Sequence, residues 1–510
     1  MFFLKLNEEN RKWWILTAMT ASISMIFVDI TVLPVVLPTL QRELEISDLG
    51  LQWIVNAYTL VLAVLILAGG RLGDIWGLKK AFCFGIFTFA AASALCGLSF
   101  SGWWMIMSRC LQGLGGAFML PATQAIIIAH FPPHQRGKAM GLFVSIGSIF
   151  LAVGPLIGGS LTSYLSWHYV FWINLPIALI GLIMTLLTVP PMEGKKEKFD
   201  FRGFIIQAVG LSCIVIALMQ IQRWGWNSGL TLSLLLIGSA MLYFLFHRKH
   251  KPHATLLDFE LMSNKSFSTA SCCILLNQMV IMVTVFWAIY FQNILGFSPS
   301  KAGFYSFIAN IPVLFAAPLG GFLVDRIGPR RPVMIGFSLI SFSLLWFCSF
   351  LRHENVWLLM PTLVTFGFGV SMIFTPSFVS MMNEVPPGKR GIASGINGAY
   401  RQFSATLGLA VFGALYSSLY LMKLGKALLT NSNTSSLDVN EFEGLLSKSP
   451  EAMHHLDRLP TNDASYIFES AKNAFLDAFS SINLLAAVLA LLGVVLAWKL
   501  LKNQPIHRGV

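Results

Sequence analysis

The chain has 510 residues, of which 55% are hydrophobic and only 11% are charged. With a mean hydropathy of +0.70, this composition excludes a soluble globular protein and predicts a polytopic membrane protein. The net charge of +12 does not indicate nucleic-acid binding, because the basic residues are dispersed over short loops between apolar runs. The expected partner is the lipid bilayer. No loop carries a pair of the seven cysteines, so neither a disulfide framework nor a cysteine metal site is expected.

Fourteen apolar runs are long enough to cross a bilayer as helices. They cover residues 13–38, 50–70, 81–99, 103–129, 139–164, 168–189, 201–221, 229–247, 266–293, 300–324, 333–351, 357–382, 391–420 and 475–498. Lys and Arg gather in every second loop, which predicts that these loops and both termini are cytoplasmic. The sequence therefore predicts an all-α protein of the cell (inner) membrane with fourteen transmembrane helices.

Two loop sequences occur twice in the chain. Residues 70–80 (GRLGDIWGLKK) recur as residues 321–331 (GFLVDRIGPRR), and residues 132–139 recur as residues 386–393 at nearly the same offset. Two such matches predict two related halves, an architecture that many secondary transporters share.

The repeat divides the chain into three expected parts. Residues 1–189 and 266–510 form two six-helix halves, and residues 190–265 form a linker with two extra transmembrane helices. The second half includes a long exterior segment, residues 421–474, which we expect to be a loosely ordered connection. A cap over the exit, or a contact for an exterior adaptor protein, is the alternative.

Two charged residues lie well inside predicted spans, Asp29 in the first run and Arg109 in the fourth. At 1.5 Å per residue, Asp29 is roughly 15 Å and Arg109 roughly 9 Å from the outer surface, so the two are expected to pair. A carboxyl group that is desolvated beside a guanidinium can bind and release a proton, which makes both residues candidates for proton coupling. A static ion pair is the alternative.

The fifth run has a face without side chains, made by Gly147, Gly154 and Gly158, with Pro155 and Gly159 beside it. This spacing of small residues lets two membrane helices approach closely, and Pro155 is expected to bend the helix. We expect this face to meet the outer part of the tenth run across the two halves and to seal the pathway outside. The small or slim residues there are Ala302, Ser306, Ala309 and Val313.

The repeated loops predict a gate on the cytoplasmic side. Gly70 and Gly77 would allow a tight turn between the second and third runs, and Asp74 would accept backbone N–H groups at a helix start. Within each half, an arginine is expected to pair with the acid. The candidate gate residues are Gly70, Asp74, Gly77 and Arg136 in the first half and Asp325, Arg326 and Arg390 in the second.

Polar and aromatic residues inside the runs are candidates for a substrate cavity. They are Trp53, Asn56, Tyr58, Gln112, Asn277, Gln278, Trp287, Tyr290, Asn310, Arg401 and Gln402. Aromatic rings can hold lipophilic cations, although aromatic residues in membrane helices also commonly face lipid or the core. The depth of Arg401 favours an inward position, and its charge argues against a site specialised only for cations.

Five stretches together resemble signatures of the major facilitator superfamily, and specifically of its fourteen-span drug:proton antiporters of the EmrB/QacA type. They are residues 70–80, Arg109-xx-Gln112-Gly113, residues 147–159, Asp29-x-Thr31-Val32 and residues 166–176. The resemblance implies export by alternating access that is driven by the proton motive force, without a cofactor. Pro34, Ile75 and the pair His168-Tyr169 depart from the family pattern.

The leading hypothesis is a proton-driven exporter of amphipathic compounds that functions as a monomer. A proton-coupled uptake permease of the same fold is the first alternative, against which the signature in the fifth run argues. An integral membrane enzyme is the second. It would need an embedded acid or base, but every histidine lies in a loop or at the end of a run. The sequence contains no glycine-rich phosphate loop, which argues against ATP-driven transport.

Overall fold

The computed structural model describes residues 8–195, 197, 199–247, 259–430, 439, 445–447 and 450–501, and within these ranges every regular element is a helix. The first group is α1 (Glu8–Glu43), α2 (Asp48–Trp76), α3 (Leu78–Gly97), α4 (Gly102–His130), α5 (Arg136–Tyr164), α6 (His168–Trp172) and α7 (Asn174–Thr188). Next come α8 (Phe201–Trp224) and α9 (Gly229–His247). The second group is α10 (Phe259–Ser263), α11 (Lys265–Ile281), α12 (Thr284–Asn293), α13 (Pro299–Ile308), α14 (Ile311–Ile327), α15 (Arg330–Phe350), α16 (Val356–Asn383), α17 (Arg390–Thr430), α18 (Pro450–Asp457) and α19 (Thr461–Leu500). Short 3-10 turns are η1 (Pro133–Gln135), η2 (Leu351–His353), η3 (Pro387–Lys389) and η5 (Leu445–Ser447).

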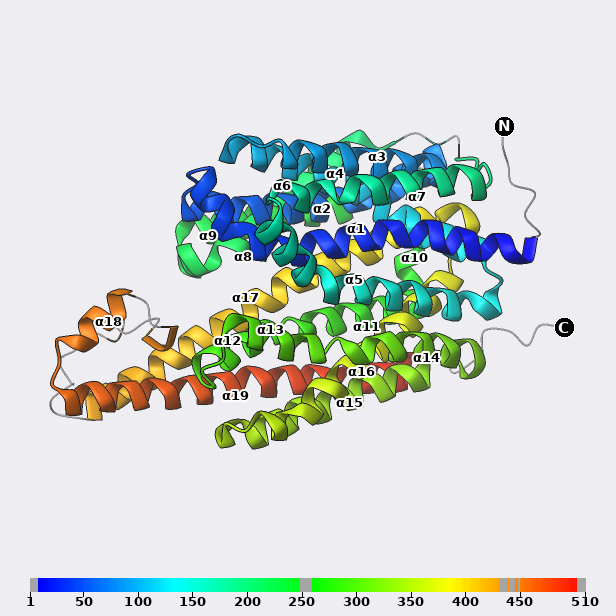
Figure 1. Cartoon of the computed structure of the whole chain (residues 1–510). Coiled ribbons are helices and arrows are strands. Elements are labelled where there is room, and N and C mark those ends of the chain that lie inside the picture. The colour runs from blue at the N-terminus through cyan, green and yellow to red at the C-terminus, as the bar shows by residue number, and fades with distance from the viewer. Residues whose placement is uncertain are drawn as a thin grey trace.

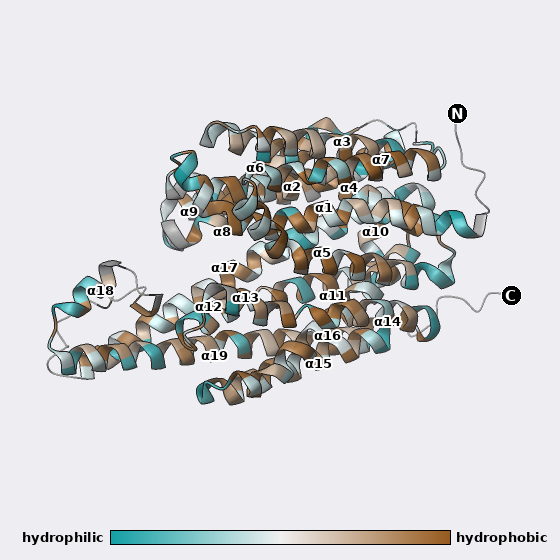
Figure 2. Ribbon diagram, viewed as in Figure 1, coloured by the Kyte–Doolittle hydropathy of each residue, from teal (hydrophilic) through white to brown (hydrophobic). Residues whose placement is uncertain are grey.

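The long helices run side by side along one direction, with the first group above the second in Figure 1. Apolar side chains cover much of their outer surface, and hydrophilic residues colour many of the helix ends (Figure 2). Polar side chains cap several helix starts. Ser47 and Ser101, for example, accept backbone N–H groups in the first turns of α2 and α4. This is the pattern of a multi-pass membrane protein.

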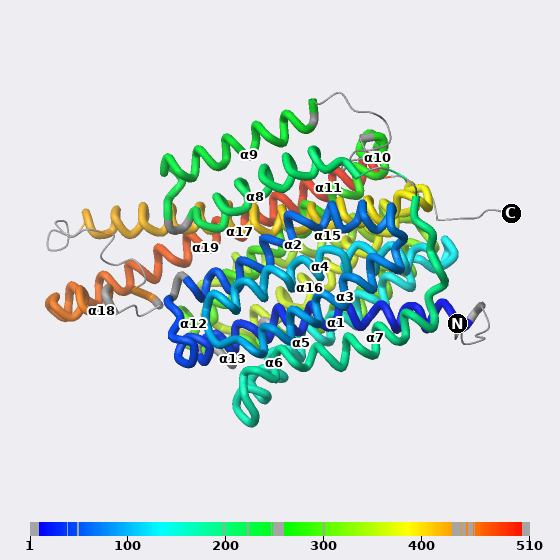
Figure 3. The backbone as a smooth tube through the Cα atoms, turned by 90° about the horizontal axis from the view of Figure 1, so that it is seen from above, coloured from blue at the N-terminus to red at the C-terminus, as the bar shows by residue number. Residues whose placement is uncertain are grey.

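The two groups meet along two pairs of helices, α2 with α17 and α5 with α14. Helices α8 and α9 pack on each other at one edge of the bundle, where α8 touches both α2 and α17 (Figure 3). We call the end of the bundle with the turns at residues 77, 131–135, 328–329 and 384–389 the basic end, which lies at the right in Figure 1.

Each of the fourteen expected runs falls on helical structure, but fewer than fourteen helices in the described part of the chain are long and apolar enough to cross a membrane. Among the described residues, 12 helices are long and apolar enough to cross a membrane. The run 229–247 forms a helix whose apolar part is shorter, Gly229–Leu245. The run 300–324 is interrupted at Ala309 and Asn310, just before Pro312, which lacks the N–H that a continuous helix needs there. The fourteen-span count therefore stays a proposal.

The described part of the segment 421–474 is largely helical, contrary to the expected loosely ordered connection. Helices α17 (41 residues) and α19 (40 residues) are each about 60 Å long, more than the 40–45 Å of a whole bilayer. They extend past the other helices at the left in Figure 1, with α18 at their tip. The Tyr466 hydroxyl donates to the Ala427 carbonyl at 2.9 Å, and Leu424 and Ile467 are fully buried. Residues 441–444 of this segment lie outside the described residues.

Candidate functional site

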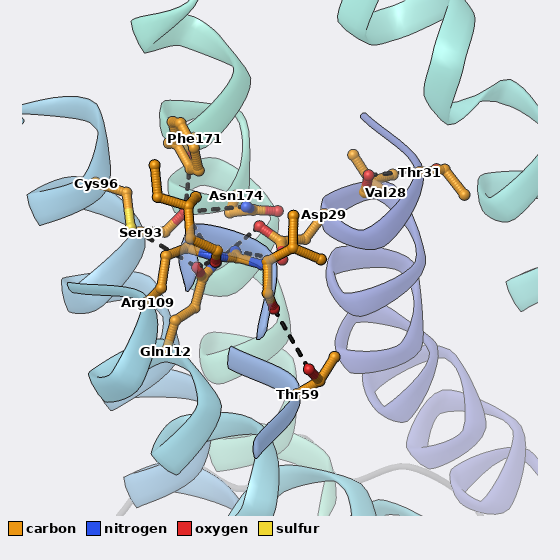
Figure 4. A network of polar contacts seen from close by, with 12 residues as sticks. Val28, Asp29, Thr31, Thr59, Ser93, Cys96, Arg109, Gln112, Phe171 and Asn174 are labelled. Atoms are coloured by element: carbon orange, nitrogen blue, oxygen red, sulfur yellow. Dashed lines mark hydrogen bonds and ion pairs between the residues drawn. The ribbon is translucent and has the colours of Figure 1, made fainter. Parts of the chain in front are cut away.

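A network of buried polar side chains lies inside the first group. Asp29 on α1 and Arg109 on α4 are only 4% and 1% exposed. Arg109 Nη1 donates to Asp29 Oδ2 at 2.7 Å and to Gln112 Oε1 at 2.6 Å, and Gln112 Nε2 donates to Asp29 Oδ1 at 2.9 Å (Figure 4). The expected pairing of Asp29 with Arg109 is thus present, and Gln112 belongs to it rather than to an open cavity.

A backbone carbonyl and an aromatic ring from α2 also contact the Arg109 guanidinium. Its Nε donates to the Ile54 carbonyl at 3.2 Å, and its Cζ lies 4.6 Å from the centre of the Tyr58 ring. Tyr58 is fully buried. Its ring packs on the Arg109 side of the ion pair, and its expected place in the substrate cavity stays a prediction.

Two polar residues in this network are ones that the sequence does not single out. Ser93 on α3 lies 3.5 Å from Gln112 Nε2, and Asn174 at the start of α7 donates to Ser93 Oγ at 3.0 Å. Both are fully buried. Their signal in the sequence is weak, a single serine or asparagine in an apolar run. We call Asp29, Arg109, Gln112, Ser93 and Asn174 the Asp29 network.

The electrostatics of the Asp29 network follow from its burial. A buried ion pair is tolerated only when the remaining donors and acceptors are also satisfied, and removing one partner leaves an uncompensated charge. Here both carboxylate oxygens of Asp29 accept a hydrogen bond, and Arg109 contacts carbonyl, carboxylate and amide oxygens as well as the Tyr58 ring. Loss of either charge would therefore leave the other charge buried without its partner.

At the basic end, two acids each cap a helix of the opposite group. Asp74 Oδ1 and Oδ2 accept the N–H groups of Gly391 and Ile392, both at 2.8 Å, in the first turn of α17. Asp325 Oδ1 and Oδ2 accept the N–H groups of Gly137 and Lys138, both at 3.0 Å, in the first turn of α5. These N–H groups have no partner within their own helix, and the positive end of the helix dipole favours an anion there.

This arrangement corrects the expected pairing of acid and arginine within each half. Among the described side chains, no ion pair joins Asp74 to Arg136 or Asp325 to Arg390. Arg136 donates instead to Asn383 of the second group and to the Phe131 carbonyl. Arg390 is buried at the start of α17. Arg326 lies with its Cζ 4.2 Å from the centre of the Phe322 ring.

Glycines allow the two groups to touch at these points. A Cβ at Gly70 would overlap the carbonyl of Gly391, and a Cβ at Gly137 would overlap the carbonyl of Gly321. Gly70 therefore serves the contact between groups and not the turn. The turn between α2 and α3 depends on Gly77 alone, whose φ of 97° is unfavourable for other residues. We call Asp74, Asp325 and the four helix-start N–H groups that they bind the gate.

The glycine face of α5 packs against α1 of its own group, which corrects its expected partner. A Cβ at Gly147 would lie 2.9 Å from Ile23, one at Gly158 would lie 2.6 Å from Val32, and one at Gly154 would overlap Thr31. A Cβ at Gly159 would have no atom of the described chain within 4 Å. The helix continues through Pro155, which is exposed.

Helix α5 does meet α14, but toward the basic end. A Cβ at Gly141 would lie 2.5 Å from the Ala317 carbonyl, and Ser145 Oγ donates to the Leu314 carbonyl at 2.7 Å. Of the residues expected to seal the outside, Ala309 packs against Gly367 of α16. The nearest described atoms to the glycine face belong to α1 and not to Ala302 or Val313, and the side chain of Ser306 lies outside the described part.

The remaining cavity candidates separate into lining and core residues. Trp287 and Asn310 line a cavity of about 130 Å³ in the second group, together with Ile281, Thr284, Ala309, Val313, Phe366, Gly367 and Val370. Tyr290 is not in the lining of this cavity; it is fully buried, and its hydroxyl donates to the Leu351 carbonyl at 2.8 Å. Asn277 is buried and donates to the Val370 carbonyl at 3.3 Å. Trp53 and Asn56 are partly exposed on α2.

Comparisons with known proteins agree with this geometry. The family model described as Major Facilitator Superfamily matches residues 19–409. The multidrug resistance protein Stp of Mycobacterium tuberculosis (strain CDC 1551 / Oshkosh) is 31% identical over 408 residues, 77% of this chain and 74% of that protein. The tetracenomycin C resistance and export protein of Streptomyces glaucescens is 28% identical over 510 residues, 98% of this chain and 94% of its own length. The solved structure of the proton:xylose symporter XylE aligns with a TM-score of 0.61 at 15% identity, covering 97% of each chain, and shows the fold alone.

Proposed function

Because the chain belongs to the major facilitator superfamily, we propose that it is a proton-coupled exporter that moves amphipathic compounds out of the cell by alternating access. Proteins of this family and fold are transporters and not enzymes, so the chain is a membrane transporter. The observation that carries the proposal is the Asp29 network, a carboxylate held by Arg109 and Gln112 away from lipid. The names of two relatives, a multidrug resistance protein and a resistance and export protein, support the direction of transport.

In the proposed mechanism, Asp29 is the proton carrier. When it is ionised, it accepts hydrogen bonds from Arg109 and Gln112 and ties α1 to α4. When it binds a proton, the attraction to Arg109 weakens, and α1 is released from α4. Exchange of that proton for cargo would couple export to the proton motive force.

The gate supplies the second element of alternating access. If the basic end is cytoplasmic, as the distribution of Lys and Arg indicates, then Asp74 and Asp325 hold the two groups together on the cytoplasmic side. Loss of these contacts would open a path from the cytoplasm. Binding of the ligand and of the proton need only change the balance between the state with the cytoplasmic side closed and the state with it open.

The finer assignments belong to the same proposal. We assign the chain to the fourteen-span EmrB/QacA type, with halves at residues 1–189 and 266–510 and a linker at 190–265. It would lie in the bacterial cell membrane as a monomer with both termini in the cytoplasm. The helical extension within residues 421–474 is the surface that an exterior adaptor protein would meet.

Proton release from the purified full chain in detergent tests the function. We expect addition of a transported amphipathic compound to release protons into a weakly buffered solution, and Asp29→Asn to abolish that release while compound binding persists. The structure offers Asp200→Asn as a matched control, since Asp200 caps α8 far from the network in sequence and contacts. Release that is unchanged in Asp29→Asn would refute the proposed carrier. Proton-driven uptake in cells, without export, would favour the uptake permease.

A further inference from the structure

A second guanidinium lies near the middle of the membrane, in the second helix group. Arg401 on α17 contacts Gln278 on α11 and Phe374 on α16. Counted from the helix ends at the basic side, Arg401 lies roughly 17 Å, Gln278 roughly 20 Å and Phe374 roughly 14 Å into the bundle at 1.5 Å per residue. With a hydrocarbon core about 30 Å thick, all three estimates place the cation in its central part.

The contacts of Arg401 leave its charge uncompensated. Its Nε donates to Gln278 Oε1 at 3.4 Å, and its Cζ lies 4.7 Å from the centre of the Phe374 ring. No described carboxylate forms an ion pair with it. Arg109, by contrast, has Asp29 at 2.7 Å. As a whole residue, Arg401 is partly exposed.

A cation at this depth favours an anion that arrives from outside the protein. An unpaired charge in the membrane interior is costly, and an opposite charge that binds there lowers that cost. The guanidinium is flat and presents paired N–H groups that match the two oxygens of a carboxylate. Within the described part of the chain, Nε is the one guanidinium nitrogen of Arg401 that has a hydrogen-bond partner.

An apolar cavity adjoins this cation on both neighbouring helices. Ile281 is one helical turn from Gln278 on α11, and Val370 is one turn from Phe374 on α16. Both residues line the cavity of about 130 Å³ that Trp287 also lines. A cavity of about this size, lined mostly by apolar residues with Thr284 and Asn310 among them, is large enough for one aromatic ring. A charged group and a ring-sized apolar space thus lie one turn apart.

We propose that Arg401 binds the acidic group of the cargo, while the adjoining cavity holds an apolar ring, so that the cargo includes amphipathic organic acids. The proposal rests on the proposed function, since it names the substrate class of the exporter. It makes Arg401 a specificity-determining residue, distinct from the Asp29 network that carries the proton.

Three ring compounds of equal length and different charge test the proposal. They are 4-butylbenzoate (an anion), 4-butylbenzamide (neutral) and 4-butylbenzylamine (a cation near neutral pH). Binding to the purified full chain is measured by calorimetry without a proton gradient. We expect the benzoate to bind at least roughly tenfold more tightly than the benzamide, which is about the contribution of one charge-assisted hydrogen-bonded pair. The benzylamine should bind more weakly than either, because its charge repels the guanidinium.

Matched variants separate charge recognition from folding. Arg401→Gln should bring the benzoate to within about twofold of the benzamide, and Arg401→Lys should keep part of the preference. Arg331→Gln, which removes a charge from an exposed position at the start of α15, should keep all of it. Retained binding of the benzamide by Arg401→Gln shows that the variant is folded. If Arg401→Gln binds neither the benzoate nor the benzamide, the Arg401→Lys protein is measured in its place. A preference of that protein for the benzoate supports the proposal, and equal affinity for the two compounds overturns it.

Two results would overturn this assignment without touching the proposed function. One is equal affinity of the wild-type chain for the benzoate and the benzamide. The other is displacement of the benzoate by chloride at comparable concentration, which would make Arg401 a site for inorganic anions. Conversely, an intact preference for the benzoate together with no proton-driven transport of any compound would refute the exporter and leave the binding site standing.

Discussion

If the gate opens as a unit, removing either acid should loosen the contacts of both acids. Asp74 and Asp325 lie in different helix groups, and each binds two N–H groups of the other group at 2.8 or 3.0 Å. If they act together, Asp74→Ala must release not only the start of α17 but also the start of α5. If each acid is only a local cap, Asp74→Ala must affect α17 alone.

The size of the effect follows from the hydrogen bonds that are lost. A bond to a charged group contributes about 1.5–3 kcal/mol, but water satisfies both partners when the gate opens. A helix cap with its dipole interaction retains a net value of about 1–2 kcal/mol. Since about 1.4 kcal/mol is a factor of ten, loss of one acid should favour opening by roughly 5- to 30-fold.

Amide hydrogen exchange followed by mass spectrometry measures this opening in the unlabelled full chain. In Asp74→Ala, we expect exchange to rise by that factor in peptides that contain Gly391 and Ile392 and also in peptides that contain Gly137 and Lys138. The matched control is Asn355→Ala, because Asn355 caps α16 through the Trp357 N–H at 3.0 Å, within the second group. That variant should raise exchange only at the start of α16.

The reasoning is refuted if Asp74→Ala raises exchange at α17 and leaves α5 unchanged. The two acids would then be independent caps, and no common opening would connect them. Asp325→Ala provides the reciprocal measurement. Because coupling between two sites is mutual, it should raise exchange at α17 by a similar factor.

Close contacts elsewhere lead to two further predictions. Gly154→Ala would force a methyl group into Thr31 of α1, so it should reduce transport and lower the midpoint of thermal unfolding. Gly159→Ala, where a Cβ has no described atom within 4 Å, should behave as wild type in the same transport and melting assays. Equal behaviour of the two variants would contradict the packing argument. Tyr466→Phe removes the hydrogen bond to the Ala427 carbonyl and should destabilise the contact between the extended parts of α17 and α19 by about 1 kcal/mol. Amide hydrogen exchange in peptides near Ala427 should then be faster, while transport is retained. Unchanged exchange there would show that the hydroxyl contributes nothing.

Part of the site is predictable because charge is rare in these apolar runs. Asp29 and Arg109 stand alone in their spans at similar depth, and a buried charge needs a partner. That argument requires no knowledge of which helices are neighbours. The same reasoning cannot find Ser93 or Asn174, because single small polar residues occur in many membrane helices without a role.

The partners at the gate and on α5 are not predictable for a different reason. The internal repeat shows which residues correspond between halves, but it does not show which half they face. The sequence therefore pairs Asp74 with Arg136 of its own half, whereas Asp74 binds the start of α17. In the same way, the spacing of Gly147, Gly154 and Gly158 predicts a close helix but cannot name it, and the neighbour is α1.

Hydropathy also fails to distinguish a cavity from a core. The sequence marks Tyr58 and Tyr290 as inward aromatic residues, and both are inward, yet one packs on Arg109 and the other on the core of the second group. Only the three-dimensional arrangement separates them from Trp287, which lines a cavity. The extension of α17 and α19 past the other helices (Figure 1) is not apparent from hydropathy, because polar residues lower the hydropathy there without ending the helix.

The observed helix contacts connect the Asp29 network to the gate more directly than the contacts expected from the sequence. Asp29 and Thr31 lie on the same helix, and Thr31 packs into the bare face of α5 at Gly154. The first turn of that same α5 provides the Gly137 and Lys138 N–H groups that Asp325 binds. In the mechanism proposed above, a movement of α1 would therefore displace α5, because Gly154 has no side chain that separates the two helices. Helix α5 in turn begins at the gate. Had the glycine face met α14 outside, as the spacing alone suggested, this rigid connection through one helix would not exist.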